Sequence, residues 1–412
     1  MNSLASVFPT GVSFAQAASI LDEVAARTAL PAERVALSRA LAQVLAEDVV
    51  ASQDLPGFDN SAMDGFALRA ADLRDGAESS LMLIGEQFAG HAVDMAIGAG
   101  QCMRITTGAP LPTGADTVVI KENVRLDREH VIVRDALVTG ANTRRAGEDV
   151  KIGDTVLAAG QVLSPAALSL AAALGLQEVA VSRRPTVAVF TTGDELRTPG
   201  MRLGPGEIYD SNRVLLQTLL LADGYQPVAW PLLPDDPARI QAALRDAAFS
   251  FDVVITCGGV SAGEKDYLPA LMAEHGDVYF WKVLMRPGMP MLAGRLGEAH
   301  LLCLPGNPVS VFATYLTLGR RFLDGLQSRR TPRMQHFARL SAEIKKPHPR
   351  LEFLRGKLSC DETGQLLVEK NPADGSHRLR AVAEANALIV VPEGAAQWPQ
   401  GSVLEVLPLP EY

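Results

Sequence analysis

The chain has 412 residues, a length that suggests roughly three domains, each able to bury its own core. Hydrophobic residues make up 48% and charged residues 21%, an ordinary globular composition that excludes extensive intrinsic disorder. The formal net charge of −9 argues against nucleic-acid binding, because a phosphate backbone attracts basic proteins.

An N-terminal region is expected over residues 1–184. Apolar residues at helical spacing after a Ser13 N-cap predict an amphipathic helix, while short β-rich runs between Gly, Pro and Asp predict a small β subdomain. The β-rich subdomain would span about 52–145, and a helical, linker-like subdomain would combine about 10–50 with 146–184. The expected elements are helices over 13–29, near 34–46 and over 164–176, with strands in LMLIG, DTVVI and HVIVR.

A doubly wound α/β domain is expected over residues 185–328. Apolar, β-branched runs alternate with helical segments there, which implies a parallel sheet covered on both faces. The expected strands are TVAVF, QPVAW, DVVIT, VYFWKV and HLLCL, and the expected helices cover about 211–223, 237–248, 267–275 and a segment from 308.

Short strands return after Arg329 and predict a C-terminal β domain, barrel-like or a sandwich, over 329–412. Residues 329–357 hold nine Lys or Arg against two Asp or Glu, a net charge of +7 in an otherwise acidic chain. Such a basic stretch suggests that an anion is attracted there, although a dimer contact with the acidic remainder is a serious alternative.

The four cysteines lie far apart in the sequence, with no C-x-x-C pair: Cys102, Cys257, Cys303 and Cys360. They predict reduced thiols in a cytoplasmic protein. The N-terminal residues lack a basic segment followed by an apolar one, so no secretory signal is expected. The most apolar window, 164–176, is too short to cross a bilayer, so membrane insertion is not expected either.

Three loops of the α/β domain follow strands, where the ligands of an open parallel sheet bind. The loops contain Thr192, Gly193, Asp194 and Glu195; Gly258, Gly259, Ser261 and Asp266; and Pro305, Gly306, Asn307 and Pro308. The glycines of the middle loop allow backbone N–H groups to form a nest for an oxyanion, and they equally fit a tight turn.

Charged residues beside these loops have two interpretations each. Glu195 and Asp266, with Asp194, would hold a divalent cation beside substrate phosphates, or act as solvated caps. Lys282 and Arg286 would neutralise a bound anion, or lie at an exposed strand end. Arg350 and Arg355 equally fit a solvated barrel face. The polar N-terminal loops 58–65, 107–110 and 145–149 fit Asx-turns when each is taken alone.

A longer series of strings carries more information than any single motif. The chain contains, in order, FDNSAMDGFA, TTGAPLPTGADTVV, RRAGEDV, TTGDEL, GEIYDSNR, DVVITCGGVSAGEKDY, WKVLMRPGMP, LPGNPVSV, GSH and EANALIVVP. This series closely resembles the molybdopterin molybdenumtransferase (MoeA) family, to which the gephyrin E domain is related. The resemblance runs from about Pro9 to the C-terminus.

The resemblance implies a two-subdomain N-terminal region, a molybdopterin-binding α/β domain, a C-terminal β domain and an elongated homodimer. It implies insertion of molybdate into adenylylated molybdopterin, with release of AMP and dependence on Mg²⁺. The dithiolene sulfurs come from the substrate, so no protein thiol is needed. Family dimers form the cleft between the second subdomain of one subunit and the last two domains of the other.

The resemblance also implies roles for particular residues. Catalytic roles fall on Asp59, Asp149, Glu195 and Asp266, of which Glu195 and Asp266 would hold the metal. Substrate-binding roles fall on Thr107, Thr192, Gly193, Gly258, Gly259, Ser261, Lys282, Arg286, Pro305, Gly306, Asn307, Pro308, Arg355 and Ser376.

Two departures from the family pattern affect anion contacts. Many relatives have a second lysine where this chain has Met289, and many have a serine near Ala381, where Arg380 would have to substitute. Two alternative functions remain open: a molybdopterin adenylyltransferase, which usually has a single such domain, and a non-catalytic cofactor carrier or scaffold. Further expected partners are the adenylyltransferase and the enzymes that accept the cofactor.

Overall fold

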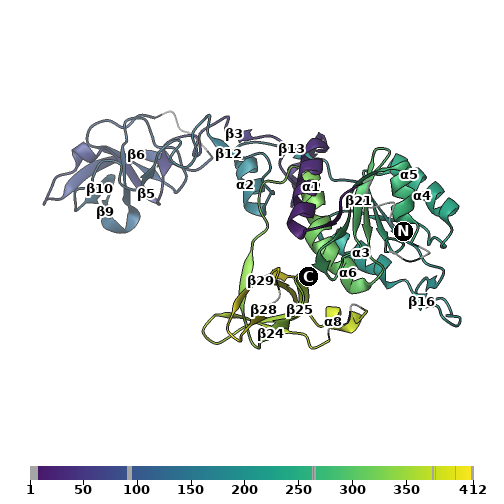
Figure 1. Cartoon of the computed structure of the whole chain (residues 1–412). Coiled ribbons are helices and arrows are strands. Elements are labelled where there is room, and N and C mark those ends of the chain that lie inside the picture. Colours follow the sequence, from purple (N-terminus) through teal and green to yellow (C-terminus); the bar gives the residue numbers. More distant parts are fainter. Residues whose placement is uncertain are drawn as a thin grey trace.

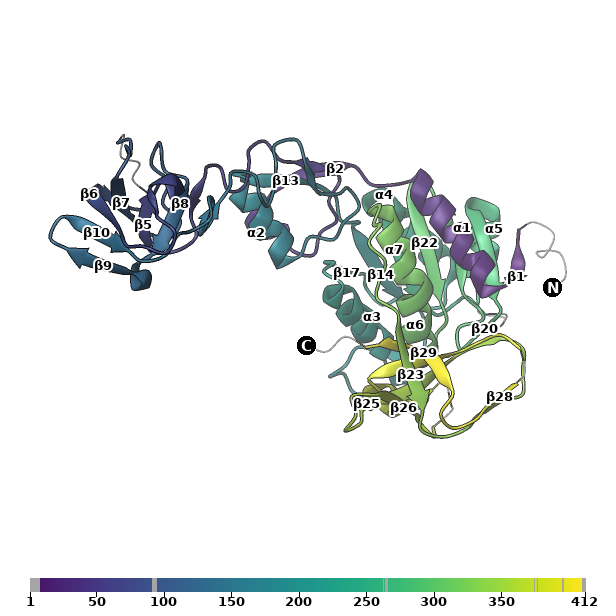
Figure 2. The ribbon, with the colours of Figure 1, turned by 90° about the vertical axis from the view of Figure 1, so that its left-hand side faces the viewer.

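Figure 1 shows the computed structural model of the whole chain, an elongated molecule with a β-rich sheet at one end and an α/β domain at the other. The C-terminal β domain lies beside the α/β domain (Figure 2). The structure describes residues 8–90, 95–261, 263, 266–373, 375, 377–394 and 396–409. None of the helices in these ranges combines the length and apolar character that a bilayer-spanning helix requires.

The distal sheet of the N-terminal region has six strands in the order β8-β5-β7-β6-β10-β9. Its strands are β5 Gly65–Leu68, β6 Ser79–Gln87, β7 Gln101–Ile105, β8 Thr117–Ile120, β9 Val124–Asp127 and β10 His130–Val133. The runs LMLIG, DTVVI and HVIVR are confirmed as strands β6, β8 and β10. Two-stranded pairs connect this sheet to the rest of the chain: β2 Ala32–Ala36 with β13 Glu178–Ser182, β3 Val49–Val50 with β12 Thr155–Leu157, and β4 Asn60–Ser61 with β11 Thr143–Arg144.

The prediction of a helix near residues 34–46 is wrong. That segment contains strand β2 and one short 3-10 turn, Leu37–Arg39. Strand β2 makes five antiparallel pairs with β13, and Val35 packs on a small core around helix α2, Pro165–Ala173. Pairing with a strand more than 140 residues away overrides the local helical pattern.

Helix α1, Phe14–Arg27, confirms the helix predicted over 13–29. The Ser13 hydroxyl accepts the Gln16 N–H at 3.1 Å, while the Gln16 side chain accepts the Ser13 N–H at 2.9 Å, so both halves of a capping box are present. The buried face of α1 packs on helix α7, Arg320–Leu326, and shares the core of the α/β domain. The helix therefore covers the α/β sheet, although its sequence position placed it in the helical subdomain.

The α/β domain has a seven-stranded sheet in the order β1-β19-β21-β22-β18-β14-β17. Its strands are β1 Thr10–Val12, β14 Val187–Thr191, β17 Val228–Ala229, β18 Val253–Cys257, β19 Asp277–Val283, β21 Leu292–Leu296 and β22 Ala299–Leu304. Its remaining helices are α3 Ser211–Ala222, α4 Pro237–Ser250, α5 Leu268–His275 and α6 Pro308–Thr314; the π-helical turn Tyr315–Gly319 joins α6 to α7. A projecting loop carries the short strands β15 Leu196–Arg197 and β16 Ile208–Tyr209.

The sheet is mixed, whereas the sequence predicted parallel strands throughout. Strands β17, β14, β18 and β22 are parallel, as a doubly wound domain requires. Strand β21, which was not predicted, runs antiparallel to both β19 and β22. Only Gly297 and Glu298 separate β21 from β22, and so short a connection can join only antiparallel neighbours. The carboxyl ends of β19 and β22 still lie at the same edge of the sheet.

The C-terminal domain is a closed β-barrel. Its strands follow the order β25-β26-β23-β29-β27, and a further pairing of β25 with β27 closes the ring. The elements are β23 His336–Leu340, β24 Ile344–Lys346, β25 Leu351–Cys360, β26 Leu366–Lys370, α8 Leu379–Ala383, β27 Ala387–Val391, β28 Ala396–Trp398 and β29 Val403–Pro408. Strand β20, Met285–Arg286, comes from the α/β domain and pairs with β25. The two domains therefore share a seam next to the carboxyl edge of the α/β sheet.

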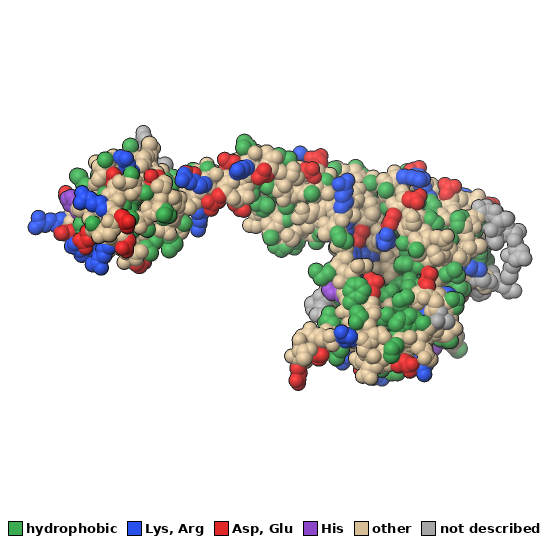
Figure 3. Space-filling view, turned by 60° about the vertical axis from the view of Figure 1, so that its left-hand side comes forward, with side chains coloured by type: hydrophobic (Ala, Val, Ile, Leu, Met, Phe, Trp, Pro, Cys, Tyr) green, Lys and Arg blue, Asp and Glu red, His purple; other side chains and the backbone are tan. Residues whose placement is uncertain are grey.

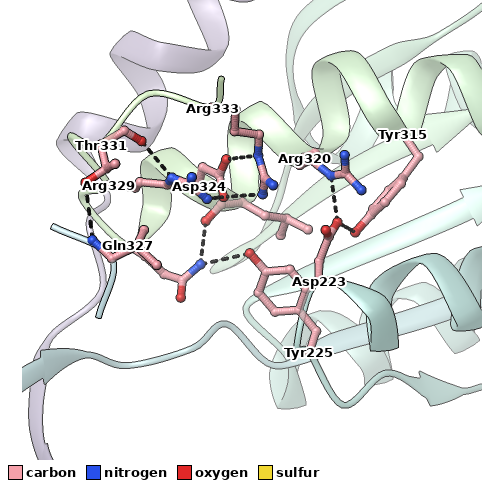
Figure 4. A network of polar contacts seen from close by, with 11 residues as sticks. Asp223, Tyr225, Tyr315, Arg320, Asp324, Gln327, Arg329, Thr331 and Arg333 are labelled. Carbon is pink, nitrogen blue, oxygen red and sulfur yellow. Dashed lines mark hydrogen bonds and ion pairs between the residues drawn. The ribbon is translucent and has the colours of Figure 1, made fainter. Parts of the chain in front are cut away.

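A polar junction connects α7 to the segment that leads into the barrel (Figure 4). The carboxylate of Asp324 accepts hydrogen bonds from Arg333 at 2.8 and 2.9 Å and pairs with Arg329 at 3.5 Å. The N–H of Arg330 donates to the carbonyl of Gly160 in the N-terminal region at 2.8 Å. One short segment thus contacts the N-terminal region and the α/β domain before entering the barrel.

A buried histidine of strand β22 predicts a pH effect on stability. His300 is 4% exposed, and its ring nitrogen Nδ1 lies 3.0 Å from the Tyr279 hydroxyl. Burial, with a smaller contribution from Arg295, lowers the pKa of His300 to about 4 from its ordinary 6.5. Because the folded state disfavours the protonated ring, stability is fully present above pH 6.5 and is lost as the pH falls toward 4.

We expect the wild type to lose about 2 kcal/mol more of its unfolding free energy than His300→Gln between pH 8 and pH 5. Glutamine keeps an acceptor for Tyr279 but cannot titrate in this range. Urea unfolding followed by tryptophan fluorescence measures the difference, because Trp230 and Trp281 both pack against the core of this domain. Equal losses in the two proteins would contradict the assignment.

Candidate functional site

The three predicted loops meet in one cavity of about 870 Å³ at the carboxyl edge of the α/β sheet. We call it the acidic cavity. The predicted residues that line it are Thr192, Gly193, Glu195, Gly258, Gly259, Ser261, Asp266, Gly306, Asn307 and Pro308. Loops after β14, β18 and β22 supply them, as expected from the rule that ligands bind beyond the carboxyl ends of parallel strands.

The floor of the acidic cavity requires glycine at two positions. Gly258 and Gly259 have φ angles of +98° and +67°, which side chains rarely adopt. A Cβ atom on either glycine would lie 3.2 Å from the Thr192 hydroxyl. Thr192 is 7% exposed, and its hydroxyl has no hydrogen-bond partner in the described part of the chain. A buried hydroxyl of this kind is available to a ligand that enters the cavity.

Four carboxylates line the acidic cavity, and no Lys or Arg does so among the described residues. Asp210 is neutralised by Arg213 at 3.2 Å and caps α3. Asp266 accepts the N–H of Gly263 at 2.7 Å, which holds its carboxylate in place. Glu195 and Asp235 complete the set. The described lining is therefore negatively charged, which favours a cation in this cavity.

A second cavity of about 410 Å³ lies at the seam between the α/β domain and the barrel. We call it the basic cavity. Arg286, Arg350 and Arg355 line it together with a single carboxylate, Glu352. Arg286 follows strand β19 as predicted, and Arg355 extends from β25, where it is 6% exposed and donates to the Ala373 carbonyl. His377 lines both cavities, so the two adjoin at this residue.

Three predicted residues belong to the N-terminal region and not to either cavity. Asp59 accepts the N–H of Ala146 at 2.8 Å and an Arg145 N–H at 3.0 Å, and these contacts hold its pKa below the usual range. The Thr107 N–H and hydroxyl both donate to Asp64 at 2.9 Å, which lowers the pKa of Asp64.

Asp149 is exposed in the same region, and its N–H donates to the carbonyl of Leu55 at 3.0 Å. Strand β5, which follows the loop that contains Asp59, lies at the end of the molecule that is far from the α/β domain (Figures 1 and 2). Within one chain, therefore, this group does not meet the two cavities.

The remaining residues singled out from the sequence differ in their relation to the two cavities. Lys282 and Pro305 line neither of them. The Lys282 ammonium lies 4.2 Å from the centre of the Trp281 ring, and its backbone has a φ of +66°. Pro305 is buried directly after the end of strand β22. Ser376 lies outside the described residues, although its neighbours Gly375 and His377 line the basic cavity. Met289 also lines that cavity, whereas Ala381 is buried within α8.

The basic stretch 329–357 does not form one anion-binding patch. Arg329 and Arg333 pair with Asp324 in the junction, and Lys345 pairs with Glu343 on the barrel surface. Of the basic residues in this stretch, Arg350 and Arg355 line the basic cavity. The role of Arg355 in attracting an anion stays a prediction, while Arg329 and Arg333 serve the interdomain junction.

Several lining residues were missed by sequence reasoning. Asn212, whose side chain donates to the Gly306 carbonyl at 2.6 Å, belongs to the string GEIYDSNR, which offered a signal. Asp235 follows β17, so it also sits beyond the end of a strand. His377 belongs to the string GSH, which offered a signal of the same kind. Glu352 carried no separate signal, because its position depends on how the barrel docks.

Comparison with protein-family models matches three stretches of the chain to regions of one family. Residues 12–175 match the MoeA N-terminal region (domain I and II), residues 188–325 a probable molybdopterin binding domain, and residues 338–409 the MoeA C-terminal region (domain IV).

Relatives match along nearly the whole chain. A molybdopterin molybdenumtransferase of Haemophilus influenzae is 37% identical over 91% of this chain and 93% of its own length. Molybdopterin molybdenumtransferase 2 of Mycobacterium tuberculosis is 40% identical over 90% of this chain and 94% of its own length. The crystal structure of the molybdopterin biosynthesis moeA protein of Pyrococcus horikoshii superposes with a TM-score of 0.83 at 27% identity, covering 96% of this chain and 99% of that one. The chain therefore belongs to the MoeA family of molybdopterin molybdenumtransferases.

Proposed function

We propose that the protein inserts molybdenum into molybdopterin, with adenylylated molybdopterin and molybdate as substrates and AMP as the released product. The observation that carries the proposal is the pair of neighbouring cavities, one lined by carboxylates and the other by arginines, with His377 in the wall of both. A nucleotide-linked pterin and a free oxyanion need two such binding places side by side.

The acidic cavity suits the phosphate groups of the pterin substrate when a divalent cation accompanies them. Glu195 and Asp266 would hold the cation, with substrate oxygens as further ligands, because Mg²⁺ commonly takes only one or two protein carboxylates. The described residues contain no group of three or more potential ligands, which fits a cation that arrives with its substrate. When bound, the cation would polarise the phosphoanhydride bond.

The chain's own groups orient the rest of the substrate. The N–H group of Gly259 and the orphaned Thr192 hydroxyl are donors at the cavity floor, whereas the Gly258 N–H already donates to the carbonyl of Leu304 at 3.1 Å. Asn307 and Pro308 begin helix α6, and Asn212 fixes the Gly306 carbonyl beside them. These donors would hold phosphate oxygens while Asp266, fixed by the Gly263 N–H, keeps its carboxylate toward the cation.

The basic cavity suits molybdate. Tetrahedral oxyanions are best recognised by guanidinium groups, which offer several N–H donors in a fixed plane. Three arginines line this cavity, and Arg350 approaches the Met289 sulfur at 3.7 Å, where the family pattern often has a lysine. Arg350 and Arg286 would therefore supply the positive charge that Met289 does not.

A homodimer would bring the N-terminal loops to the cavities. Asp59, Thr107 and Asp149 lie far from both cavities in one chain, so a role in the reaction requires a second copy. The projecting loop that carries β15 and β16 exposes Met201, Ile208 and Tyr209, of which Ile208 and Tyr209 also line the acidic cavity. Figure 3 shows further hydrophobic side chains gathered where the barrel meets the α/β domain. Exposed apolar surface of this kind favours association.

The deciding experiment incubates the purified protein with adenylylated molybdopterin, Mg²⁺ and molybdate and follows AMP by chromatography. AMP release that requires both Mg²⁺ and molybdate supports the proposal. A protein that instead adenylylates molybdopterin would support the adenylyltransferase alternative, and one that only binds the pterin would be a carrier. The proposal places the reaction in the cytoplasm, before transfer of the cofactor to acceptor enzymes, and four free cysteines are consistent with that compartment.

Arg355 provides a specific test of the basic cavity. We expect Arg355→Ala to weaken molybdate binding by about tenfold or more, because one charge-assisted contact contributes about 1.5–3 kcal/mol. The molybdate affinity of Arg355→Lys should lie between those of the wild type and Arg355→Ala, since lysine keeps the charge but loses the planar guanidinium group.

Arg339, an exposed arginine of the same barrel, provides the matched control, Arg339→Ala. Calorimetric titration at two salt concentrations measures all four proteins. A dimeric Arg355→Ala protein with unchanged affinity would assign Arg355 to structure alone.

A further inference from the structure

The wall of the basic cavity contains a carboxylate that an anion-binding site does not need. Glu352 is 7% exposed and lies on strand β25. Its Oε1 atom is 3.4 Å from Nε of Arg286, and its Oε2 atom is 3.3 Å from Nε2 of His348. A carboxylate buried to this degree is costly unless it is partnered, and here the arginine supplies the opposite charge while the histidine ring lies beside the second oxygen. Its position in the wall is therefore built into the fold.

Glu352 sets the charge balance of the cavity. Arg286, Arg350 and Arg355 contribute three positive charges, and Glu352 is the one carboxylate among the described lining residues. Among the described lining residues, Glu352 is thus the one negative charge set against the positive charge of the arginines. Without Glu352 the same cavity would be more positive and would bind a dianion more tightly.

We propose that Glu352 limits the affinity of the basic cavity for its oxyanion, so that the bound oxyanion can leave for the acidic cavity. The inference rests on the proposed function, in which molybdate occupies the basic cavity first and reacts beside the pterin substrate. His377, in the wall of both cavities, marks the side toward which the oxyanion leaves. Glu352 is then an affinity-setting residue that acts by repulsion of the substrate and by neutralising Arg286.

The test is Glu352→Gln, which keeps the shape and an acceptor for Arg286 but removes the charge. Titration calorimetry with sodium molybdate should show a dissociation constant about tenfold lower than that of the wild type, with a smaller difference at high salt. In steady state, KM for molybdate and kcat should fall together while kcat/KM changes little, because the ground state is stabilised but the transition state beyond the cavity is not. Glu343→Gln, on the exposed side of the barrel, is the control and should match the wild type.

A second variant tests the charge balance without altering the buried carboxylate. Met289 lines the same cavity and is 37% exposed, so Met289→Lys adds a positive charge at the rim. This variant should also bind molybdate more tightly, and it decides the question if Glu352→Gln does not fold. Wild-type protein that does not bind molybdate would overturn the proposed function itself. Wild-type binding that neither substitution tightens would overturn only the role of Glu352.

Discussion

Replacing Asp266 by asparagine is expected to slow AMP release by about 100-fold or more, because the charge that holds the cation beside the substrate phosphates is lost. Asparagine still accepts the N–H of Gly263, so the loop and the fold should persist. Glu195→Gln should have a comparable effect, since Glu195 lies in the same cavity on the loop after β14. Both variants should need more Mg²⁺ to reach half of their own maximal rate.

Asp246 provides a matched control for these substitutions. It is exposed on helix α4, away from the cavity lining, so Asp246→Asn removes a carboxylate from the same domain without changing the site. Rates are measured as AMP formed at saturating substrates over a series of Mg²⁺ concentrations. Rates within twofold of the wild type, with ordinary Mg²⁺ dependence, would remove Asp266 and Glu195 from the mechanism.

A mixture of Asp59→Ala and Asp266→Ala chains is expected to regain activity that neither variant has alone. If each cleft takes Asp59 from one subunit and Asp266 from the other, a mixed dimer has one cleft with both carboxylates and one with neither. Random mixing would then restore about a quarter of the wild-type rate, because about half of the dimers are mixed and each has one intact cleft.

The experiment requires two different affinity tags, so that mixed dimers are purified and their composition is known. The separation of Asp59 from the acidic cavity within one chain is the physical reason to expect complementation. Confirmed mixed dimers that remain inactive would exclude a cleft shared in this way, whatever the roles of the two carboxylates. Mixing two preparations of Asp266→Ala is the negative control.

The loops of the acidic cavity were predictable because local and topological rules agree. Thr192, Gly258 and Gly306 each follow an apolar strand. The rule that parallel strands end at the same edge of a sheet was therefore enough to predict that these residues lie together. Strand β2 was missed because its pairing partner lies far along the chain, and no local pattern records such a pairing. The antiparallel strand β21 was missed for a related reason, because its direction depends on a two-residue turn at Gly297.

The basic cavity was only half predictable. Arg286 and Arg355 were identified, but their meeting depends on strand β20 of one domain pairing with β25 of another. Glu352 and His377 belong to the same interdomain seam, so a chain position alone could not assign them to a cavity. The excess charge at 329–357 pointed to an anion, yet Arg329 and Arg333 are held by Asp324. Composition alone does not distinguish arginines that bind ligands from those that hold domains together.

The junction around Asp324 has a consequence for exchanging modules between relatives. Its arginines come from the segment before the barrel and its carboxylate from helix α7 (Figure 4). Gly160 of the N-terminal region accepts the Arg330 N–H. A Cβ atom on Gly160 would lie 2.5 Å from the Arg330 side chain, so this crossing tolerates no larger residue. A chimaera that takes its barrel from another family member should therefore be cut after Arg333, and one cut at the end of α7 would need the donor's counterparts of Asp324 and Gly160 as well.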